Sequence, residues 1–389
     1  MAFPIDPTDP DPATAVDADP TASAVELLAS TIAPGGYGGL YRDGSSLYAG
    51  FTSNVDGNTA LLRLAFPSLE LRGFLVQHAW DALTAITNEI TDTMTADTSG
   101  QILSVTPDET QNTVQVGVAD PNSPEALSLA AQYGNAISIF QDDPIQLLSG
   151  ANTLAIQGTA PAVSVAAARS PAPGRDDFHD PVLAGLHISG DGTHCTAGFG
   201  YTERTLGIEH GVMTAGHCFT GQPRLTEWRQ GVKTLGTFSR TRDINNSTAD
   251  AGTISTDLGF IRFRSVSNQV FIAPNAATVS IVKRAALNSG RRSDVVCTSG
   301  AYGGFACGAL VAGGQGGNYK VAPGFTLRNV YKASFSGPIL PGDSGAPVFT
   351  ADGVALGIMF AANSRNPRVG FYSQIRNAEN QLNVVTNTG

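Results

Sequence analysis

The chain has 389 residues, of which 42% are hydrophobic and only 14% charged, and it contains 44 glycines and 22 prolines. At roughly 150 residues per domain, this length excludes a mini-protein and allows two or three domains with cores of their own. So many turn-forming residues favour a loop-rich, mainly β protein with little long helix.

The charge is divided unevenly along the chain. Residues 1–179 carry 21 acidic side chains against five arginines and no lysine, about −16, whereas the rest is about +6 within a total of −10. Parts of opposite sign can attract each other, although an acidic region that only aids solubility explains much of this charge equally well. Neither part is basic enough over a compact patch to predict nucleic-acid binding.

Residues 1–33 are rich in Asp, Pro, Ala and Thr, and we expect them to be disordered apart from a short apolar turn at Ala24–Ile32. Their start lacks the basic and then apolar stretches of a signal peptide, and 18 consecutive apolar residues occur nowhere. No membrane partner is therefore predicted. We expect that an export leader has been removed.

Residues 34–147 predict a small α+β domain. The expected elements, in chain order, are a hairpin around Asp43-Gly44, a strand at Thr59–Leu64, an amphipathic helix within Gly73–Met94, a hairpin around Asp108–Asn112, a helix from Asn122 to Gly134 and a strand at Ala136–Phe140. The domain has no cysteine and no polar cluster that suggests chemistry.

Residues 148–180, rich in Ala, Pro and Ser, predict an exposed linker that is cleaved near His179–Pro181. Beyond it, residues 181–389 consist of short apolar runs between Gly-rich turns, which is typical of a β-barrel domain. A final helix is expected at Arg376–Val384.

All four cysteines, Cys195, Cys218, Cys297 and Cys307, lie in this second half in two pairs that are local in sequence. This pattern favours two disulfides and an oxidising compartment. A zinc site fits poorly because no pair has C-x2-C spacing. We expect no metal and no cofactor.

Three segments carry candidate chemistry, and the first is GVMTAGHCFTG at 211–221. A lone histidine is more often structural than catalytic, but His217 follows an apolar strand end and two small residues that let it turn into a cleft. Cys218 is placed to fix that turn through Cys195.

The second segment, STDLGFIRF, places Asp257 directly before an apolar strand. A carboxylate there needs a partner, and an imidazole N–H would serve. Asp250, in the polar loop NSTADAG, is the rival, but nothing in that loop forces its burial. We therefore favour Asp257.

The third segment is PGDSGAPVF at 341–349. Glycines on both sides of Asp343 and Ser344 allow a tight turn that presents backbone N–H groups beside the serine hydroxyl, as an oxyanion hole requires. A turn without chemistry is the alternative, but it explains poorly why all three segments occur in this order.

Together these segments resemble the chymotrypsin-like serine endopeptidases, and most of all the bacterial secreted branch of α-lytic protease and the streptogrisins. The resemblance covers about residues 181–389 and implies a double six-stranded antiparallel β-barrel. It implies that Ser344 attacks the peptide carbonyl, that His217 transfers the proton and that Asp257 orients the imidazole. It also implies Gly342 and Ser344 as oxyanion donors and a disulfide between Cys297 and Cys307.

The first half resembles the pro regions of that branch, which assist folding and inhibit the protease. The resemblance implies a secreted zymogen whose partners are its own N-terminal pro region and polypeptide substrates. Autocleavage in the linker should then release a protease of about 21 kDa.

Several positions depart from the family pattern. Ala346 replaces a glycine after the nucleophile, and Phe360 stands where a small serine normally supports the triad carboxylate. Thr298 replaces an arginine that would pair with Asp343, for which Arg291 or Arg292 is the expected substitute.

The resemblance also assigns the residues of the specificity pocket. Ala361 and Ala362 replace glycines on the substrate-binding strand, and Ala362 should narrow the mouth of the pocket. Pro338 and Ile339 at the base supply no carboxylate, which favours cleavage after small or medium apolar residues.

Two other hypotheses remain. Phe360 and Thr298 suggest a catalytically weak or inactive binding module, although such a lineage need not keep a complete His, Asp and Ser. An esterase would use the same acyl transfer, but would not need a strand that pairs with an extended peptide.

Overall fold

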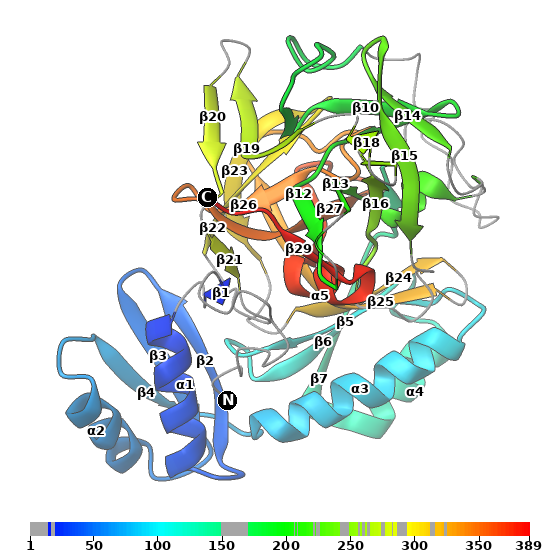
Figure 1. Cartoon of the computed structure of the whole chain (residues 1–389). Helices are drawn as coiled ribbons and strands as arrows, with labels where there is room; N and C mark the ends of the chain where they lie inside the picture. The colour runs from blue at the N-terminus through cyan, green and yellow to red at the C-terminus, as the bar shows by residue number, and fades with distance from the viewer. Residues whose placement is uncertain are drawn as a thin grey trace.

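The computed structural model describes residues 15–16, 20–148 and 170–389, except 206, 208, 221, 223–225, 242–248, 256, 259–260, 263–264, 274–276, 282, 286–293, 312–315 and 323–324. A small α+β part, blue to cyan in Figure 1, lies below a larger, mainly β part coloured green to red. The predicted mainly β fold with a small α+β domain before it is confirmed.

The α+β part has two halves, and in each half helices pack on a layer of three strands (Figure 1). The first half contains α1 (Pro20–Ile32), β2 (Tyr37–Asp43), β3 (Ser46–Phe51), α2 (Val55–Ala65) and β4 (Leu71–Leu75). The second contains α3 (Trp80–Ala96), β5 (Ile102–Asp108), β6 (Thr113–Val118), α4 (Pro124–Tyr133), the 3₁₀ turn η2 (Gly134–Ala136) and β7 (Ile137–Gln141).

Two helices in the first half correct the sequence prediction. Residues 20–32 form α1 and not merely an apolar turn, because Ala22, Val25 and Ala29 recur at helical spacing and are fully buried. The strand expected at Thr59–Leu64 is part of α2, in which Thr59 and Leu62 face the core. The exposed residues Leu61 and Leu64 contributed to the apparent strand pattern. The buried residues Thr59 and Leu62, however, are three positions apart, which is a helical spacing.

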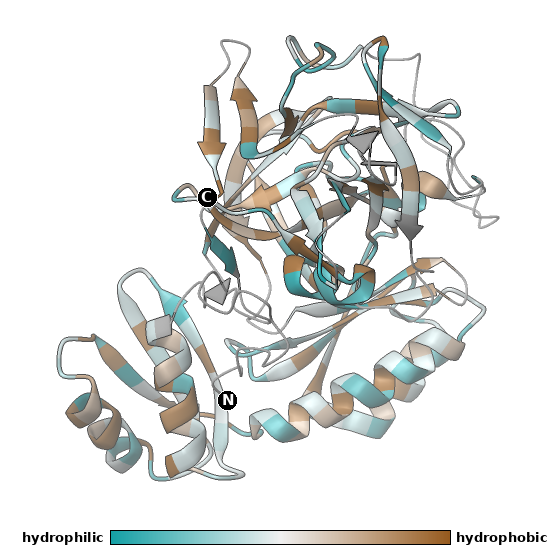
Figure 2. Cartoon of the chain, viewed as in Figure 1, coloured by the Kyte–Doolittle hydropathy of each residue, from teal (hydrophilic) through white to brown (hydrophobic). Residues whose placement is uncertain are grey.

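The other predicted elements of this part are present. Both hairpins form around their expected turns, and Ser123 caps α4 by accepting the Ala126 N–H at 3.2 Å. The amphipathic helix begins only at Trp80, because Leu71–Leu75 before it is strand β4. Figure 2 shows hydrophobic and hydrophilic residues alternating along α3, whose apolar side packs on β5 and β6.

The larger part contains two main sheets. An eight-stranded sheet has the order β11-β10-β14-β15-β16-β13-β12-β29. Its strands are β10 (His187–Gly190), β11 (Thr193–Thr196), β12 (Gly200–Glu203), β13 (His210–Thr214), β14 (Glu227–Gln230), β15 (Lys233–Thr241), β16 (Gly252–Ser255) and β29 (Val384–Thr386).

The second main sheet is built on β27 (Val354–Asn363), which pairs with strands on both of its sides. Its other strands in this part are β21 (Lys283–Ala285), β22 (Val295–Gly300), β23 (Gly304–Leu310), β24 (Gly317–Ala322), β25 (Phe325–Phe335), β26 (Pro347–Phe349) and β28 (Val369–Gln374). The smaller strands are β1 (Ala15–Val16), β8 (Ile145–Leu147), β9 (Val182–Ala184), β17 (Asp257–Leu258), β18 (Ile261–Arg262), β19 (Val266–Ala273) and β20 (Ala277–Ser280).

This second sheet continues from the larger part into the α+β part. Strand β24 pairs antiparallel with β5, so β5, β6 and β7 extend the sheet that carries β27. Further along the chain, β8 pairs with residues 361–363 of β27, beyond the residues of β27 that pair with β26. Strand β1 also pairs, in parallel, with β21. The first part of the chain is therefore attached to the second by backbone pairing at three separate places in the described residues.

The C-terminal helix α5 (Ile375–Leu382) confirms the predicted final helix and is held by a buried ionic cluster. Glu379 is fully buried and receives hydrogen bonds from Arg376 at 2.6 Å, from Arg284 at 3.2 Å and from the Thr386 N–H at 2.8 Å. Because buried charges are costly unless paired, this carboxylate ties the helix to β21 and β29.

We expect Glu379→Ala to lower the free energy of unfolding by about 3–5 kcal/mol, because it leaves two buried guanidinium groups without their carboxylate. Glu227→Ala is the matched control, since its pair with Arg229 is solvent-exposed and worth less than about 1 kcal/mol. Urea unfolding of both variants in a Ser344→Ala background measures the difference. Equal losses for the two variants would contradict a structural role for the cluster.

Candidate active site

His217 lies in the 3₁₀ turn η3 (Gly216–Phe219), directly after β13. The predicted disulfide between Cys195 and Cys218 is present and joins this turn to β11. Gly216 is required here, because a Cβ on it would come within 2.7 Å of an oxygen of Asp250. The motif thus brings the imidazole against a carboxylate from a distant loop.

Asp250 is that carboxylate. Its Oδ2 is hydrogen-bonded to His217 Nδ1, and its Oδ1 accepts the backbone N–H of His217 at 2.9 Å. The Asp250 side chain is fully buried, and its own N–H donates to Ser373 Oγ at 2.9 Å. Asp250 therefore orients the imidazole.

The prediction that Asp257 orients His217 is wrong, because both oxygens of Asp250 already contact that residue. Asp257 lies in β17, a two-residue strand paired with β18, and its side chain is outside the described part of the structure. The error came from treating NSTADAG as a solvated loop. The available signal in the sequence was the pair of small apolar residues beside Asp250, Ala249 and Ala251, which are buried in the structure.

Ser344 lies in the predicted glycine-flanked turn, and its Oγ is 2.7 Å from His217 Nε2. Gly345 has φ +92°, and a Cβ there would approach Thr214 Oγ1 to 2.0 Å, so only glycine fits beside the histidine turn. Gly342 has φ +98° and packs against the ring of Tyr302. The turn thus brings the serine hydroxyl and the imidazole into direct contact.

The backbone N–H of Gly342 donates a hydrogen bond to the carbonyl oxygen of Leu148. This places a peptide carbonyl where the oxyanion hole was predicted. The N–H of Ser344 remains a predicted second donor.

Residues 145–148 occupy the edge of β27 in an extended conformation. Within the β8–β27 pair, Leu147 lies opposite Ala361 and Gln146 opposite Ala362. The Leu148 N–H donates to the carbonyl of Phe360 at 3.3 Å. A segment of the chain itself therefore lies along the strand expected to bind substrate.

The residues predicted for the specificity pocket differ in burial and in the apolar cluster to which they belong. The Leu148 side chain is 2% exposed and belongs to the same buried apolar cluster as Ile339 and Ala362. Ala361 is buried in the adjacent cluster, whereas Pro338 is exposed. Their role in specificity remains a prediction.

Phe360 and Thr298 do not disturb the site in the way their departures suggested. The Phe360 side chain is fully buried in the core, and its carbonyl accepts the Leu148 N–H. The support given to Asp250 by Ser373, on the neighbouring strand β28, was missed because it requires knowledge of the strand pairing. Thr298 Oγ1 donates to the Pro347 carbonyl at 3.1 Å.

Asp343 is held mainly by backbone groups. Its carboxylate accepts N–H groups of Leu340, Tyr302 and Gly303 at 2.7–3.1 Å. The loop of Tyr302 and Gly303 joins β22 to β23, which are linked by the predicted Cys297–Cys307 disulfide. Arg291 and Arg292, the expected partners, lie outside the described residues.

Comparison with known proteins assigns the family. The family model described as Trypsin matches residues 175–381, more than half of the chain. The chain belongs to the trypsin family. It is a serine-type endopeptidase. No curated protein sequence matches the chain.

Several solved structures are similar to about half of this trypsin-family chain. Thermobifida fusca Protease A is 21% identical, with a TM-score of 0.42 over 54% of this chain and 99% of its own. Nocardiopsis Protease is 25% identical, with a TM-score of 0.43 over 53% of this chain and 99% of its own. Cellulomonas bogoriensis chymotrypsin is 22% identical, with a TM-score of 0.41 over 54% and 99%.

Across the residues that the structure describes, this trypsin-family protease has no cluster of three or more His, Cys, Asp or Glu side chains suited to a metal ion. Within the same part of the chain, no helix is long and apolar enough to cross a membrane.

We expect Asp250→Asn to lower kcat by about 10⁴-fold, because an amide at this position favours the wrong imidazole tautomer. Asp257→Asn is the matched control and should retain activity within about threefold, because both oxygens of Asp250 already contact His217. Hydrolysis of a fluorogenic peptide, after the same limited removal of residues 1–148 by an added protease, measures both. A large loss for Asp257→Asn with little loss for Asp250→Asn would restore the original assignment.

Proposed function

We propose that this protease is a secreted serine endopeptidase made as a latent zymogen, whose N-terminal part inhibits it by leaving Leu148 in the active site. The observation that carries the proposal is the hydrogen bond from the Gly342 N–H to the Leu148 carbonyl. The pairing of β8 with β27 supports it, because extended substrates bind endopeptidases by the same kind of strand addition. Two disulfides favour an oxidising compartment.

The geometry supports acyl transfer in two steps. Ser344 Oγ attacks the carbonyl carbon while its proton passes to His217 Nε2, and Gly342 N–H stabilises the negative oxygen. The proton then goes to the leaving amine as the C–N bond breaks. In the second step His217 takes a proton from water as the water oxygen attacks the acyl carbon, and it returns the proton to Ser344 Oγ as the bond between Oγ and the acyl carbon breaks. Asp250 stabilises the imidazolium in both steps.

The position of Leu148 favours cleavage after medium-sized apolar residues. Its side chain is buried with Ile339 and Ala362, which carry no charge to attract Arg or Lys. Upstream, Ile145 is also buried in the protease core, whereas Gln146 is half-buried. An apolar residue three positions before the cleavage residue should therefore aid binding as well.

The same contacts favour the Leu148–Ser149 bond as the site of self-cleavage, in place of the bond near His179–Pro181 that the linker composition suggested. Residues around Ala172 and Arg175 belong to the protease side: Ala172 N–H donates to the Ala301 carbonyl at 2.8 Å. A cut at 179–181 would separate these contacts from the enzyme.

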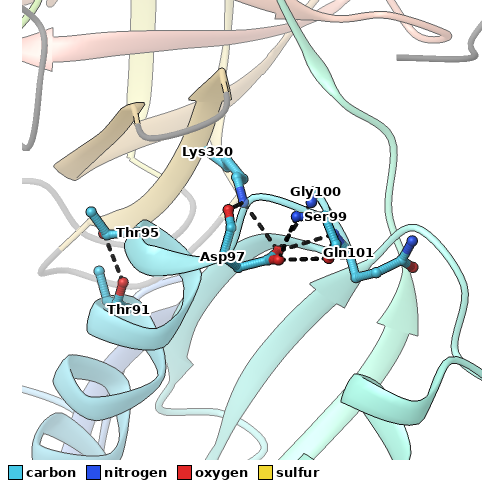
Figure 3. A network of polar contacts seen from close by, with 7 residues as sticks. All are labelled: Thr91, Thr95, Asp97, Ser99, Gly100, Gln101 and Lys320. Atoms are coloured by element: carbon cyan, nitrogen blue, oxygen red, sulfur yellow. Dashed lines mark hydrogen bonds and ion pairs between the residues drawn. The ribbon is translucent and has the colours of Figure 1, made fainter. Parts of the chain in front are cut away.

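The ion pairs between the two parts follow the opposite charges of the sequence. Arg328 contacts Asp92 at 2.6 Å, and Arg365 contacts Asp143 at 2.7 Å. Lys320 is the buried member of the set, donating to the Asp97 carbonyl oxygen and, at 3.1 Å, to its Oδ2 (Figure 3). In each pair the acid belongs to the first part of the chain, which supports its role as an inhibitory partner.

A catalytically inactive binding module is not favoured. Ser344 contacts His217, and His217 contacts Asp250. Ser373 Oγ accepts the backbone N–H of Asp250 and so helps to fix this residue, although Phe360 replaces the usual serine. An esterase has no use for the backbone pairing along β27.

We expect the purified wild type to shorten and Ser344→Ala to stay at full length, because hydrolysis needs the nucleophile. N-terminal and mass analysis should locate the first cut after Leu148. Leu148→Asp should slow this cut at least about 100-fold, because a carboxylate would be buried among apolar side chains, whereas Leu148→Met should leave it within a few-fold. A first cut elsewhere that is unaffected by Leu148→Asp would contradict the proposal.

A fluorophosphonate probe tests the activated serine directly. Labelling should require both Ser344 and His217 and should increase when residues 1–148 dissociate. No labelling of a folded wild type in either state would reject the endopeptidase mechanism and restore the binding-module hypothesis.

We expect Lys320→Met to weaken inhibition by the cleaved N-terminal part by about 30-fold or more, because it removes one partner of a buried charged pair. Arg365→Met is the matched control: its side chain is 74% exposed, so the change should stay below about fivefold. Inhibition constants measured with the self-cleaved complex give both values. Equal effects would contradict a special role for Lys320.

The same contact makes inhibition sensitive to acid. Burial opposes ionisation of Asp97, but hydrogen bonds from Ser99 and Lys320 outweigh it and lower the pKa to about 2. The Ser99 contacts lie within the N-terminal part and persist when it dissociates, so only the lowering caused by Lys320 is linked to binding. That contribution stabilises the complex while Asp97 is ionised and is lost as the pH falls from about 4 to 2. Dissociation of the Asp97→Asn complex, measured by size-exclusion chromatography in a Ser344→Ala background, should therefore vary less over that range than dissociation of the complex with Asp97.

A further inference from the structure

Two histidines, His187 and His194, lie together near the oxyanion turn. Their rings are stacked with centroids 5.2 Å apart, and His187 Nε2 is 3.0 Å from His194 Nδ1. The other ring nitrogen of His187 is 2.6 Å from Asp176 Oδ1. A carboxylate and two imidazoles thus form a continuous chain of hydrogen bonds that does not include the catalytic residues.

The strand pairing places these histidines relative to the nucleophile. In the hairpin of β10 and β11, His187 lies opposite Thr196, and His194 is two residues before Thr196. Because side chains alternate along a strand, all three point to one face of the hairpin. On that face, Thr196 Oγ1 donates to the Gly342 carbonyl at 2.8 Å. His194 is partly exposed, so it is the solvent end of a row of side chains that starts at the oxyanion turn.

Tyr302 connects the histidines to the same turn. Its ring lies edge-on to that of His187, with centroids 5.6 Å apart. A Cβ on Gly342 would come within 2.2 Å of the Tyr302 ring, so the ring and the turn are in contact. The histidine pair is therefore joined through one side chain to the residue whose N–H binds the Leu148 carbonyl.

The histidines lie on the side of the active site where the leaving amine departs. In the proposed mechanism, His217 gives its proton to that amine. Cys218, the residue after it, forms a disulfide with Cys195, the residue after His194. The acyl side of the site is occupied by Ile145–Leu147, which pair with β27. Residues that follow the cleaved bond are therefore directed towards β11, on which His194 lies.

The hydrogen bonds determine which ring nitrogens carry protons. An ionised carboxylate only accepts, so His187 Nδ1 carries the proton that it donates to Asp176. Burial lowers the pKa of His187, although Asp176 opposes this, so at neutral pH His187 Nε2 has no proton and accepts. The proton between the two rings then belongs to His194 Nδ1, which leaves His194 Nε2 as an acceptor.

The neighbouring groups leave Asp176 as the main charge of this cluster. Tyr302 is neutral, because burial and the charges of Asp176 and Asp343 raise its pKa to about 12. Arg175 Nη1 donates to the Gly185 carbonyl at 2.6 Å, so this cation is engaged outside the pair. The Asp176 side chain is 57% exposed and, in the part of the chain that the structure describes, is the charged group that contacts the histidines directly.

We propose that His194 is a specificity-determining residue: its Nε2 accepts a hydrogen bond from a Lys or Arg side chain among the first three residues after the cleaved bond. Asp176, acting through His187, is the positioning residue that fixes the His194 tautomer and supplies negative charge. Asp191, in the exposed turn between β10 and β11, has the same sign. This inference rests on the proposed endopeptidase function and adds a preference on the leaving side to the apolar preference on the acyl side.

Peptide hydrolysis by the self-processed enzyme tests the preference. Fluorogenic peptides with Ile-Gln-Leu-Leu before the cleaved bond carry Lys, its uncharged analogue norleucine, or Glu at one of the three positions after it. At pH 8, Lys at one of these positions should raise kcat/KM at least about fivefold over norleucine, because a hydrogen bond to a charged group is stronger than a neutral one. His194→Ala should bring this Lys-to-norleucine ratio close to one and leave hydrolysis of the norleucine peptide little changed.

The pH dependence of the ratio distinguishes recognition from a merely structural role. Protonation turns His194 Nε2 into a donor, so the ratio should fall towards one as the pH is lowered from about 8 to about 5, and the Glu peptide should gain. His194→Gln keeps an acceptor that does not titrate, so it should retain part of the preference without this pH dependence. A ratio in His194→Gln that varies with pH as in the wild type would contradict the inference.

Two variants of neighbouring acids test the positioning role. Asp176→Asn should lower the Lys-to-norleucine ratio severalfold, because it removes the charge and no longer fixes the tautomer of His187. Asp177→Asn is the matched control, since Asp177 is also exposed and next in the chain, and it should leave the ratio unchanged. Equal effects of the two variants would contradict a role for the hydrogen-bonded chain.

The wild type alone decides the inference if the variants fail to fold. Equal hydrolysis of Lys and norleucine peptides at all three positions at pH 8 would overturn it. Fluorophosphonate labelling of Ser344 keeps this result separate from the proposed function. A labelled enzyme without the preference overturns this inference alone, whereas a folded wild type that is not labelled overturns the endopeptidase function with it.

Discussion

The pairing of residues 145–147 with β27 is the interaction on which the organisation of the molecule depends. A protease that binds extended peptides must leave backbone donors and acceptors open beside its nucleophile, and an open strand edge also invites unwanted pairing. Here the chain covers that edge with its own upstream segment. The continuous sheet from β24 into β5 keeps the segment close, because the rest of the N-terminal part is fixed to the same sheet.

The sequence was sufficient for the residues whose chemistry is local. Ser344 between glycines and His217 after two small residues are recognisable, because the turn geometry itself requires those neighbours. The aspartate that orients His217 could not be recognised from its neighbours in the sequence. Asp250 contacts His217 of the turn η3 and Ser373 of strand β28, which are distant from it in the sequence, and a polar loop gives little sign of its burial. The backbone N–H partners of Asp343 were missed for the same reason.

The N-terminal part was predicted well where turns are marked and poorly where two periodicities compete. Hairpins around Asp43-Gly44 and residues 108–112 follow from their turn residues. In α2, a run of leucines satisfies both a strand and a helix pattern, and packing on β4 decides in favour of the helix. The linker was predicted to be too long, because composition does not reveal that Leu148 and residues near Ala172 have contacts with the protease part.

The form of latency follows from the completeness of the active site. Ser344 contacts His217 at 2.7 Å, Asp250 holds the imidazole, and Gly342 already donates to a carbonyl, so no catalytic group awaits rearrangement. In the proposed zymogen, inhibition would therefore come from occupancy, and the dissociation of residues 20–148 would be the activating event. Dissociation has to break both the β24–β5 pairing and the Lys320 contact, which lie away from the nucleophile. In this proposal, cleavage of one peptide bond and release of inhibition are separate steps, and release depends on a surface that takes no part in the chemistry.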